Sequence, residues 1–212
     1  MAGLGSLAAF VAWTLAVRVA DVKAIGPRGS AVGFATMNGW FHEWTGANMS
    51  LYVITDWLGL VPIGVAFGFA VLGLCQWIKR KRLDRVDRSL MILGGFYIAV
   101  MAVYALFEVV AINHRPVLID GRLETSYPSS TTMLVMCVMP TAVMQWRDRL
   151  KRTALRRAVA WLTWGFVAFM VVGRVVSGVH WLSDIIGGAL VSVGLVLLYR
   201  AAVGCATPKN QI

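Results

Sequence analysis

The stretch Gly173-Arg174-Val175-Val176-Ser177-Gly178-Val179-His180-Trp181-Leu182-Ser183-Asp184 lies between two long apolar runs, at 158–172 and 185–199. An arginine, a histidine and an aspartate occur together there, in a sequence that otherwise keeps ionisable groups out of such runs. Because charged side chains at a hydrocarbon boundary cost free energy, their presence favours a functional site. The alternative is structural: a hydrogen-bonded histidine and a helix-capping aspartate at a membrane interface.

The spacing of these three residues indicates what they could do chemically. If the chain is helical from His180 onward, His180 and Asp184 lie one turn apart on the same face. The carboxylate could then accept a hydrogen bond from one imidazole nitrogen and leave the other nitrogen free to attack. Arg174 adds a planar guanidinium that is suited to phosphate oxygens.

The composition indicates a membrane protein. The chain has 212 residues, of which 58% are hydrophobic and 14% charged. A soluble domain of this size would not carry several apolar runs of membrane-spanning length, so we expect one integral membrane domain over residues 1–212. The expected fold class is all-α, a polytopic membrane helical bundle of six transmembrane helices with an interfacial helical segment in 21–50. The six spans are expected at about 4–20, 52–78, 89–112, 128–146, 158–172 and 185–199.

Basic residues account for a net charge of +10, and they cluster at the ends of the apolar runs. The loops after the second and fourth runs hold six Lys or Arg each, whereas the connection at 113–127 holds only Arg115 and Arg122. The positive-inside rule therefore predicts cytoplasmic termini and basic loops, with the stretch at 173–184 on the extracytoplasmic side. This distribution is typical of membrane topology and not of a nucleic-acid partner.

Two further motifs lie on the side expected to face outward: Asn113-His114-Arg115-Pro116 and Pro128-Ser129-Ser130-Thr131-Thr132. A proline followed by small hydroxyl residues at the start of an apolar run predicts a helix N-terminus, whose free backbone N–H groups attract anions. Arg115 can supply a second guanidinium. These features together predict a phosphate site, although the serines could merely cap a span and Arg115 could extend to the interface.

These motifs resemble those of the type 2 phosphatidic acid phosphatase (PAP2) superfamily, which is related to the vanadium haloperoxidases. The resemblance rests on Arg115-Pro116, Pro128-Ser129-Ser130 and Arg174-x5-His180-x3-Asp184, and it covers about residues 90–200. It implies a phosphatase in which His180 is the nucleophile, forming a phosphohistidine, and Asp184 orients it. It also implies phosphate binding by Arg115, Arg174, Ser129, Ser130 and the neighbouring N–H groups, including that of Thr131.

Three positions depart from the family pattern. Glu108 stands where a phosphate-binding lysine is expected, Gly173 replaces a serine, and Thr131 replaces the histidine that protonates the leaving group. General acid catalysis is typically worth about 10²–10⁴-fold, so an alkoxide would leave slowly without that histidine. A diphosphate needs less help because its leaving group is already a stable anion.

Three hypotheses remain open from the sequence. The protein could be a phosphatase or phosphotransferase that acts on a lipid diphosphate, such as a polyprenyl diphosphate, through phospho-His180. His114 could instead replace the missing acid, so that lipid monophosphates remain substrates. Alternatively, the protein could bind or transport a phosphorylated lipid headgroup without turnover, which Glu108 and Thr131 favour. The intact His180–Asp184 pair favours an enzyme.

The expected partners are a lipid phosphate or diphosphate and the bilayer that holds its tail, and the oligomeric state is not indicated. We expect no metal and no cofactor, because the arginines and a helix end supply the positive charge and the acids are scattered. The small size and six-span layout favour a bacterial cell membrane. The chain has three cysteines, Cys75, Cys137 and Cys205, and their spacing predicts neither a disulfide framework nor a zinc site.

Overall fold

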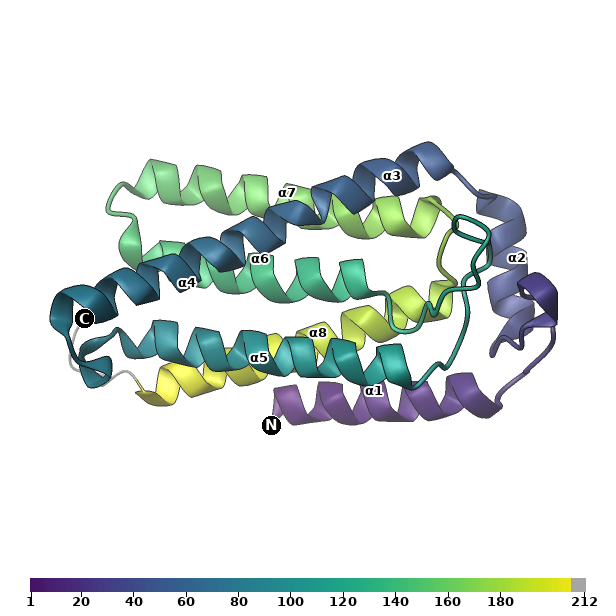
Figure 1. The fold of residues 1–212 in the computed structure, drawn as a ribbon, viewed down its shortest axis with the longest axis horizontal. Helices are drawn as coiled ribbons and strands as arrows, with labels where there is room; N and C mark the ends of the chain where they lie inside the picture. Colours follow the sequence, from purple (N-terminus) through teal and green to yellow (C-terminus); the bar gives the residue numbers. More distant parts are fainter. Residues whose placement is uncertain (207–212) are drawn as a thin grey trace.

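The computed structural model describes residues 1–206, and its long elements in that range are all helices (Figure 1). This agrees with the predicted fold class, because helices satisfy their backbone hydrogen bonds internally and can therefore cross lipid. Two short 3-10 turns, η1 (Pro27–Gly29) and η2 (Leu83–Arg85), lie in connections. The α-helices are α1 (Ala2–Val19), α2 (Ala35–Thr45), α3 (Met49–Leu58), α4 (Leu60–Arg80), α5 (Arg88–Val109), α6 (Ser130–Arg149), α7 (Thr153–Val176) and α8 (Leu182–Ala206).

The helices extend a few residues beyond most of the apolar runs that predicted them. The run expected at 52–78 forms two helices, α3 and α4, which are separated by the single residue Gly59. The segment at 21–50, expected along the membrane surface, contains η1 and α2 and ends at the start of α3. Helices α7 and α8 continue past the apolar runs at 158–172 and 185–199 in both directions.

Five helical stretches of the described chain are long and apolar enough to span a membrane: α1, α3 with α4, α5, α7 and α8. The predicted count of six spans is not confirmed, because α6 is less apolar than the others. Half of the 20 residues in α6 are buried, including polar Thr132, Thr141 and Gln145. Thr141 and Gln145 have internal partners: Thr141 Oγ1 donates to the Cys137 carbonyl over 2.8 Å, and Gln145 Nε2 donates to Tyr199 Oη over 2.5 Å.

Helix α6 occupies the centre of the bundle and packs against α4, α5, α7 and α8 (Figure 1). A helix surrounded by protein does not need a lipid-facing apolar surface, whereas the outer helices expose many large apolar side chains, including Leu15, Phe67, Ile98 and Trp161. The low hydropathy of α6 is therefore a consequence of its central position.

The connections sort to opposite ends of the bundle (Figure 1). The loops at 81–87 and 150–152, which belong to the two basic clusters, lie at the end of the bundle where α8 ends. The connections at 110–129 and 177–181 lie at the other end together with α2. All three sequence motifs therefore converge on the end of the bundle that is remote from the basic loops.

Candidate active site

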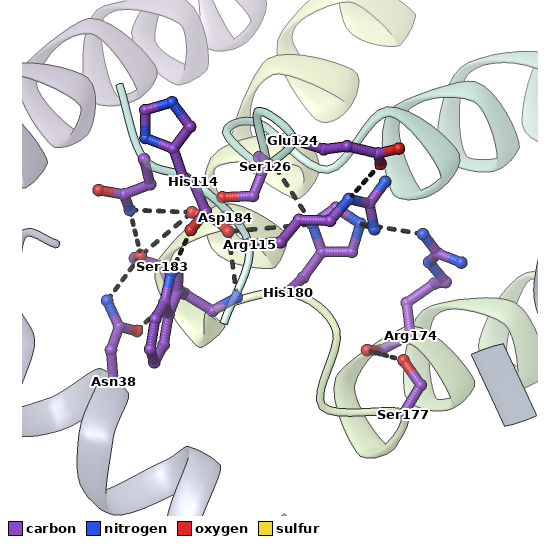
Figure 2. A network of polar contacts seen from close by, with 12 residues as sticks. Asn38, His114, Arg115, Glu124, Ser126, Arg174, Ser177, His180, Ser183 and Asp184 are labelled. Atoms are coloured by element: carbon purple, nitrogen blue, oxygen red, sulfur yellow. Dashed lines mark hydrogen bonds and ion pairs between the residues drawn. The ribbon is translucent and has the colours of Figure 1, made fainter. Parts of the chain in front are cut away.

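His180 lies in the turn between α7 and α8, where only 4% of the residue is exposed. Its Nε2 is 2.9 Å from Arg174 Nη2 and 3.3 Å from Arg115 Nη1, and its Nδ1 is 3.1 Å from the Ser126 carbonyl oxygen (Figure 2). A guanidinium can only donate hydrogen bonds, so Nε2 must accept. The ring proton therefore lies on Nδ1, which donates to Ser126.

The surroundings keep this imidazole neutral. Burial is the largest influence that lowers the pKa of His180 well below its ordinary value of 6.5, and the charges of Arg115 and Arg174 lower it further. The hydrogen bond to the Ser126 carbonyl opposes this shift only in part. A neutral ring with an unprotonated Nε2 is the form in which histidine can act as a nucleophile.

The two guanidinium groups are fixed by their own contacts. Arg174, in the last turn of α7, is 1% exposed, and Arg115 is 9% exposed. Both stack over the Tyr52 ring of α3, with the guanidinium carbons 5.0 Å (Arg174) and 5.7 Å (Arg115) from its centroid. Carboxylates flank the two cations on the outside. Arg174 Nη1 is 3.8 Å from Asp56 Oδ1, and Arg115 Nε is 3.0 Å from Glu124 Oε2.

The start of α6 adds donors of the kind that bind anions. Ser129 is the N-cap, it is fully buried, and its hydroxyl has no hydrogen-bond partner among the described residues. Its backbone N–H donates to the Asp184 carbonyl over 3.1 Å, which ties α6 to α8. The next backbone N–H groups, at 130–132, lie in the first turn and have no acceptor within the helix.

Some of these residues line a cavity of about 450 Å³. Arg115, Ser130 and His180 are on its wall, whereas Arg174 and Ser129 lie behind it and are not among its lining residues. The other charged or polar residues on its wall include Tyr104, Glu108, Glu124 and Thr125. The cavity wall therefore includes a cation, a neutral imidazole and two carboxyl groups, one of which is paired with the cation.

The contact predicted between His180 and Asp184 is not a hydrogen bond. The helix α8 begins at Leu182, so His180 precedes it and the helical spacing does not apply. His180 Nδ1 is 3.9 Å from Asp184 Oδ2, and the Ser126 carbonyl receives the ring proton instead. Orientation of the ring by direct contact with Asp184 was therefore a wrong expectation.

Asp184 instead joins three segments of the chain (Figure 2). Its carboxylate accepts from Trp181 N and from Asn113 Nδ2, both over 3.0 Å, and lies 3.4 Å from Ser183 Oγ. Asn38 of α2 extends this network, because its Nδ2 donates to Ser183 Oγ over 2.9 Å and its Oδ1 accepts from Ser183 N over 3.1 Å. The sequence offered no signal for Asn38, which lies in the segment expected along the membrane surface.

His114 and Thr131 are not brought into the cavity. Residues 113–115 pair with 124–126 as a short antiparallel ladder, so His114 and Arg115 point to opposite sides. Figure 2 shows the His114 ring directed away from His180. Its backbone carbonyl, at 2.7 Å, accepts from Trp181 Nε1. Thr131 lines a neighbouring apolar groove with Leu60, Ile63 and Leu134.

The structure also shows the contacts of Glu108 and Gly173, the other two positions that depart from the family pattern. Glu108, near the end of α5, is exposed and accepts from Thr125 Oγ1 over 3.2 Å. Gly173 packs under α3, where an added Cβ would lie 2.7 Å from the Thr55 methyl group. The missing serine side chain at 173 therefore permits the close approach of α3 to Arg174.

Comparison with known proteins agrees with this arrangement. The chain is similar over 98% of its length to the crystal structure of the first transmembrane PAP2 type phosphatidylglycerolphosphate phosphatase from Bacillus subtilis, with 98% of that chain covered, 16% sequence identity and a TM-score of 0.58. This similarity shows a shared fold, while no curated protein sequence matches the chain. The family model described as "PAP2 superfamily" matches residues 63–205, more than half of the chain. The chain therefore belongs to the PAP2 superfamily, as its three motifs predicted.

Proposed function

We propose that the protein is a membrane phosphatase or phosphotransferase that removes a phosphoryl group from a lipid phosphate or diphosphate through a phosphohistidine at His180. The convergence of two buried guanidinium groups on the unprotonated Nε2 of His180 carries this proposal. A phosphoryl group bound there would accept hydrogen bonds from the same guanidinium groups and place its phosphorus beside the nitrogen.

In the proposed reaction, different residues bind the phosphoryl group and attack it. Arg115, Arg174 and the first N–H groups of α6 hold the phosphoryl oxygens and stabilise the charge that develops on them. Arg174 Nε and Ser129 Oγ, both buried without hydrogen-bond partners among the described residues, would find acceptors in a bound phosphate. His180 Nε2 attacks phosphorus, and water or a second acceptor then takes the phosphoryl group from the ring.

An apolar groove beside the cavity supports a lipid as the substrate. The groove that contains Thr131 is lined mostly by apolar residues of α4, α5 and α6, and it shares Tyr104, Ser130 and Met133 with the phosphate cavity. A headgroup in the cavity could therefore keep its chain against the bundle. The basic loops lie at the opposite end, which by the positive-inside rule supports a site on the extracytoplasmic face of a cell membrane (Figure 1).

A second candidate function is binding or transport of the headgroup without turnover. The ion pair between Glu124 and Arg115 favours it, since a carboxylate already occupies one side of the phosphate clamp. The neutral, correctly protonated His180 favours the enzyme, because a headgroup-binding protein needs no nucleophile.

Phosphate release from four lipids separates these possibilities: a polyprenyl diphosphate, a polyprenyl monophosphate, phosphatidate and phosphatidylglycerolphosphate. His180→Ala should lower release at least about 10³-fold for every lipid that the protein cleaves. His114→Ala is the matched control and should keep monophosphate cleavage, because that ring lies outside the cavity. Headgroup binding with no release from any of the four lipids would contradict the enzyme and support the binding protein.

A further inference from the structure

The described part of the cavity contains no histidine placed to protonate the leaving group. Thr131 occupies the expected position, lines the neighbouring groove and cannot donate a proton usefully. His114 points away, and His180 is the nucleophile. A lipid alkoxide leaves slowly unless another group donates a proton to it.

The remaining ionisable residues on the cavity wall narrow the choice to two carboxyl groups. These residues are Tyr104, Glu108, Arg115, Glu124 and Tyr127. Arginine is never deprotonated, and tyrosine is ordinarily a weak acid. The Tyr127 hydroxyl is also engaged with Thr14 Oγ1 over 2.6 Å.

The two carboxyl groups differ in their partners. Glu124 forms an ion pair with Arg115 at 3.0 Å. Glu108 forms no ion pair among the described residues, and its side chain accepts hydrogen bonds from the Thr125 hydroxyl at 3.2 Å and from the Tyr104 hydroxyl. It is also exposed, so it can exchange protons with water. Thr125 precedes Ser126, whose carbonyl oxygen accepts the hydrogen bond from His180 Nδ1. Glu108 is therefore linked through Thr125 to the segment that positions His180.

We infer that Glu108 is the general acid that protonates the leaving oxygen of a lipid phosphate monoester, in place of the missing histidine. This inference rests on the proposed function. Of the two carboxyl groups on the cavity wall, Glu124 is held by Arg115, so Glu108 is the one that has no cation beside it among the described residues. Diphosphates are then no longer required as substrates, because an alcohol can leave with a proton.

The proton balance is complete with water as the only co-reactant. His180 Nε2 forms a bond to phosphorus while the bond from phosphorus to the lipid oxygen breaks, and that oxygen takes the Glu108 proton. The lipid alcohol departs and Glu108 is left as a carboxylate. In the second half, water forms a bond to phosphorus and gives a proton to Glu108, while the bond from phosphorus to His180 Nε2 breaks and its electron pair returns to the ring, so that inorganic phosphate is released.

Leaving-group dependence tests this role on the full-length protein in detergent. The 4-nitrophenolate anion needs no proton, so Glu108→Gln should slow 4-nitrophenyl phosphate cleavage by no more than about threefold. The same variant should slow phosphatidate cleavage by about 10²–10⁴-fold. Turnover of the nitrophenyl ester also shows that the variant is folded.

Two variants make the outcome unambiguous. Glu124→Gln acts through Arg115 and should change both substrates by a similar factor, whereas His180→Ala should abolish both reactions. Equal losses on both substrates in Glu108→Gln, or a selective phosphatidate loss in Glu124→Gln instead, would overturn the role of Glu108. Persistent turnover in His180→Ala would instead contradict the proposed function itself.

Discussion

The protonation of one side chain, His180, determines whether the site can react. Its Nε2 faces two guanidinium groups, and its Nδ1 proton is held by a backbone carbonyl. An imidazolium there would be buried beside two cations with no carboxylate in hydrogen-bond contact. The same groups that would bind phosphate in the proposed reaction therefore also keep His180 unprotonated at Nε2.

Nitrogen NMR of ¹⁵N-histidine-labelled protein in detergent should show this state directly. The signals that disappear in His180→Ala should report a neutral ring with its proton on Nδ1 at pH 6.0, because the folded pKa lies well below 6.5. The unfolded chain binds a proton near pH 6.5, so this histidine should make the fold less stable as pH falls below that value. A ring that titrates at or above 6.5, or that carries its proton on Nε2, would contradict the geometry.

Single residues also show where sequence patterns stop being informative. Arg115, Arg174 and His180 were predictable as neighbours, because they match the spacing of the family motifs and lie in connections that the charge pattern places on one side of the membrane. The ring partner was not predictable, since the Ser126 carbonyl is a backbone group that any residue provides. The side chains of His114 and Arg115 point in opposite directions because residues 113–115 pair with 124–126. No hydrophobic pattern in these segments predicts that pairing.

At the level of elements, the turn between α7 and α8 places His180 against the guanidinium groups. Gly178 has φ +64°, and a Cβ there would lie 1.7 Å from the Gly46 carbonyl oxygen. The segment after α2 closes onto this turn through a hydrogen bond of 2.9 Å from Asn48 N to the Ser177 carbonyl. Only glycine fits both the backbone conformation and the contact.

Gly178→Ala should therefore destabilise the protein and impair the site. Left-handed strain alone costs about 1 kcal/mol, and the clash with a backbone carbonyl adds to it. We expect a melting temperature several degrees lower in detergent, together with a loss of phosphate release. Gly165→Ala on α7 is the control, because nothing lies within 4 Å of an added Cβ and helix propensity should improve. Equal melting temperatures for the two variants would show that the turn tolerates a side chain.

The elements themselves were predictable to within a few residues, because long apolar runs have few alternatives to helices in a membrane. Two features were not. Helix α6 is less apolar than the membrane-spanning helices, because it lies at the centre of the bundle and does not need to face lipid. The start of α8 at Leu182, two residues after His180, depends on the cap formed by Asp184 on Trp181 N.

At the scale of the whole molecule, the proposed function depends on three distant segments meeting at one end of the bundle. The positive-inside pattern predicted that 113–116, 128–132 and 173–184 share a membrane face, and the structure brings all three to the end remote from the basic loops (Figure 1). The network that joins α2 to Ser183 and Asp184 was invisible in the sequence, since its residues are ordinary asparagines and serines far apart along the chain.

Rapid-quench trapping of the phosphorylated protein tests most directly whether the three segments form a site in which His180 is the nucleophile. Protein mixed with a lipid phosphate carrying ³²P in its terminal group should become labelled, and the label should be stable in base, labile in acid and located on His180 by mass spectrometry. His180→Ala should remain unlabelled. A label on any other residue, or hydrolysis that continues at the wild-type rate in His180→Ala, would contradict a nucleophilic histidine held by the two guanidinium groups.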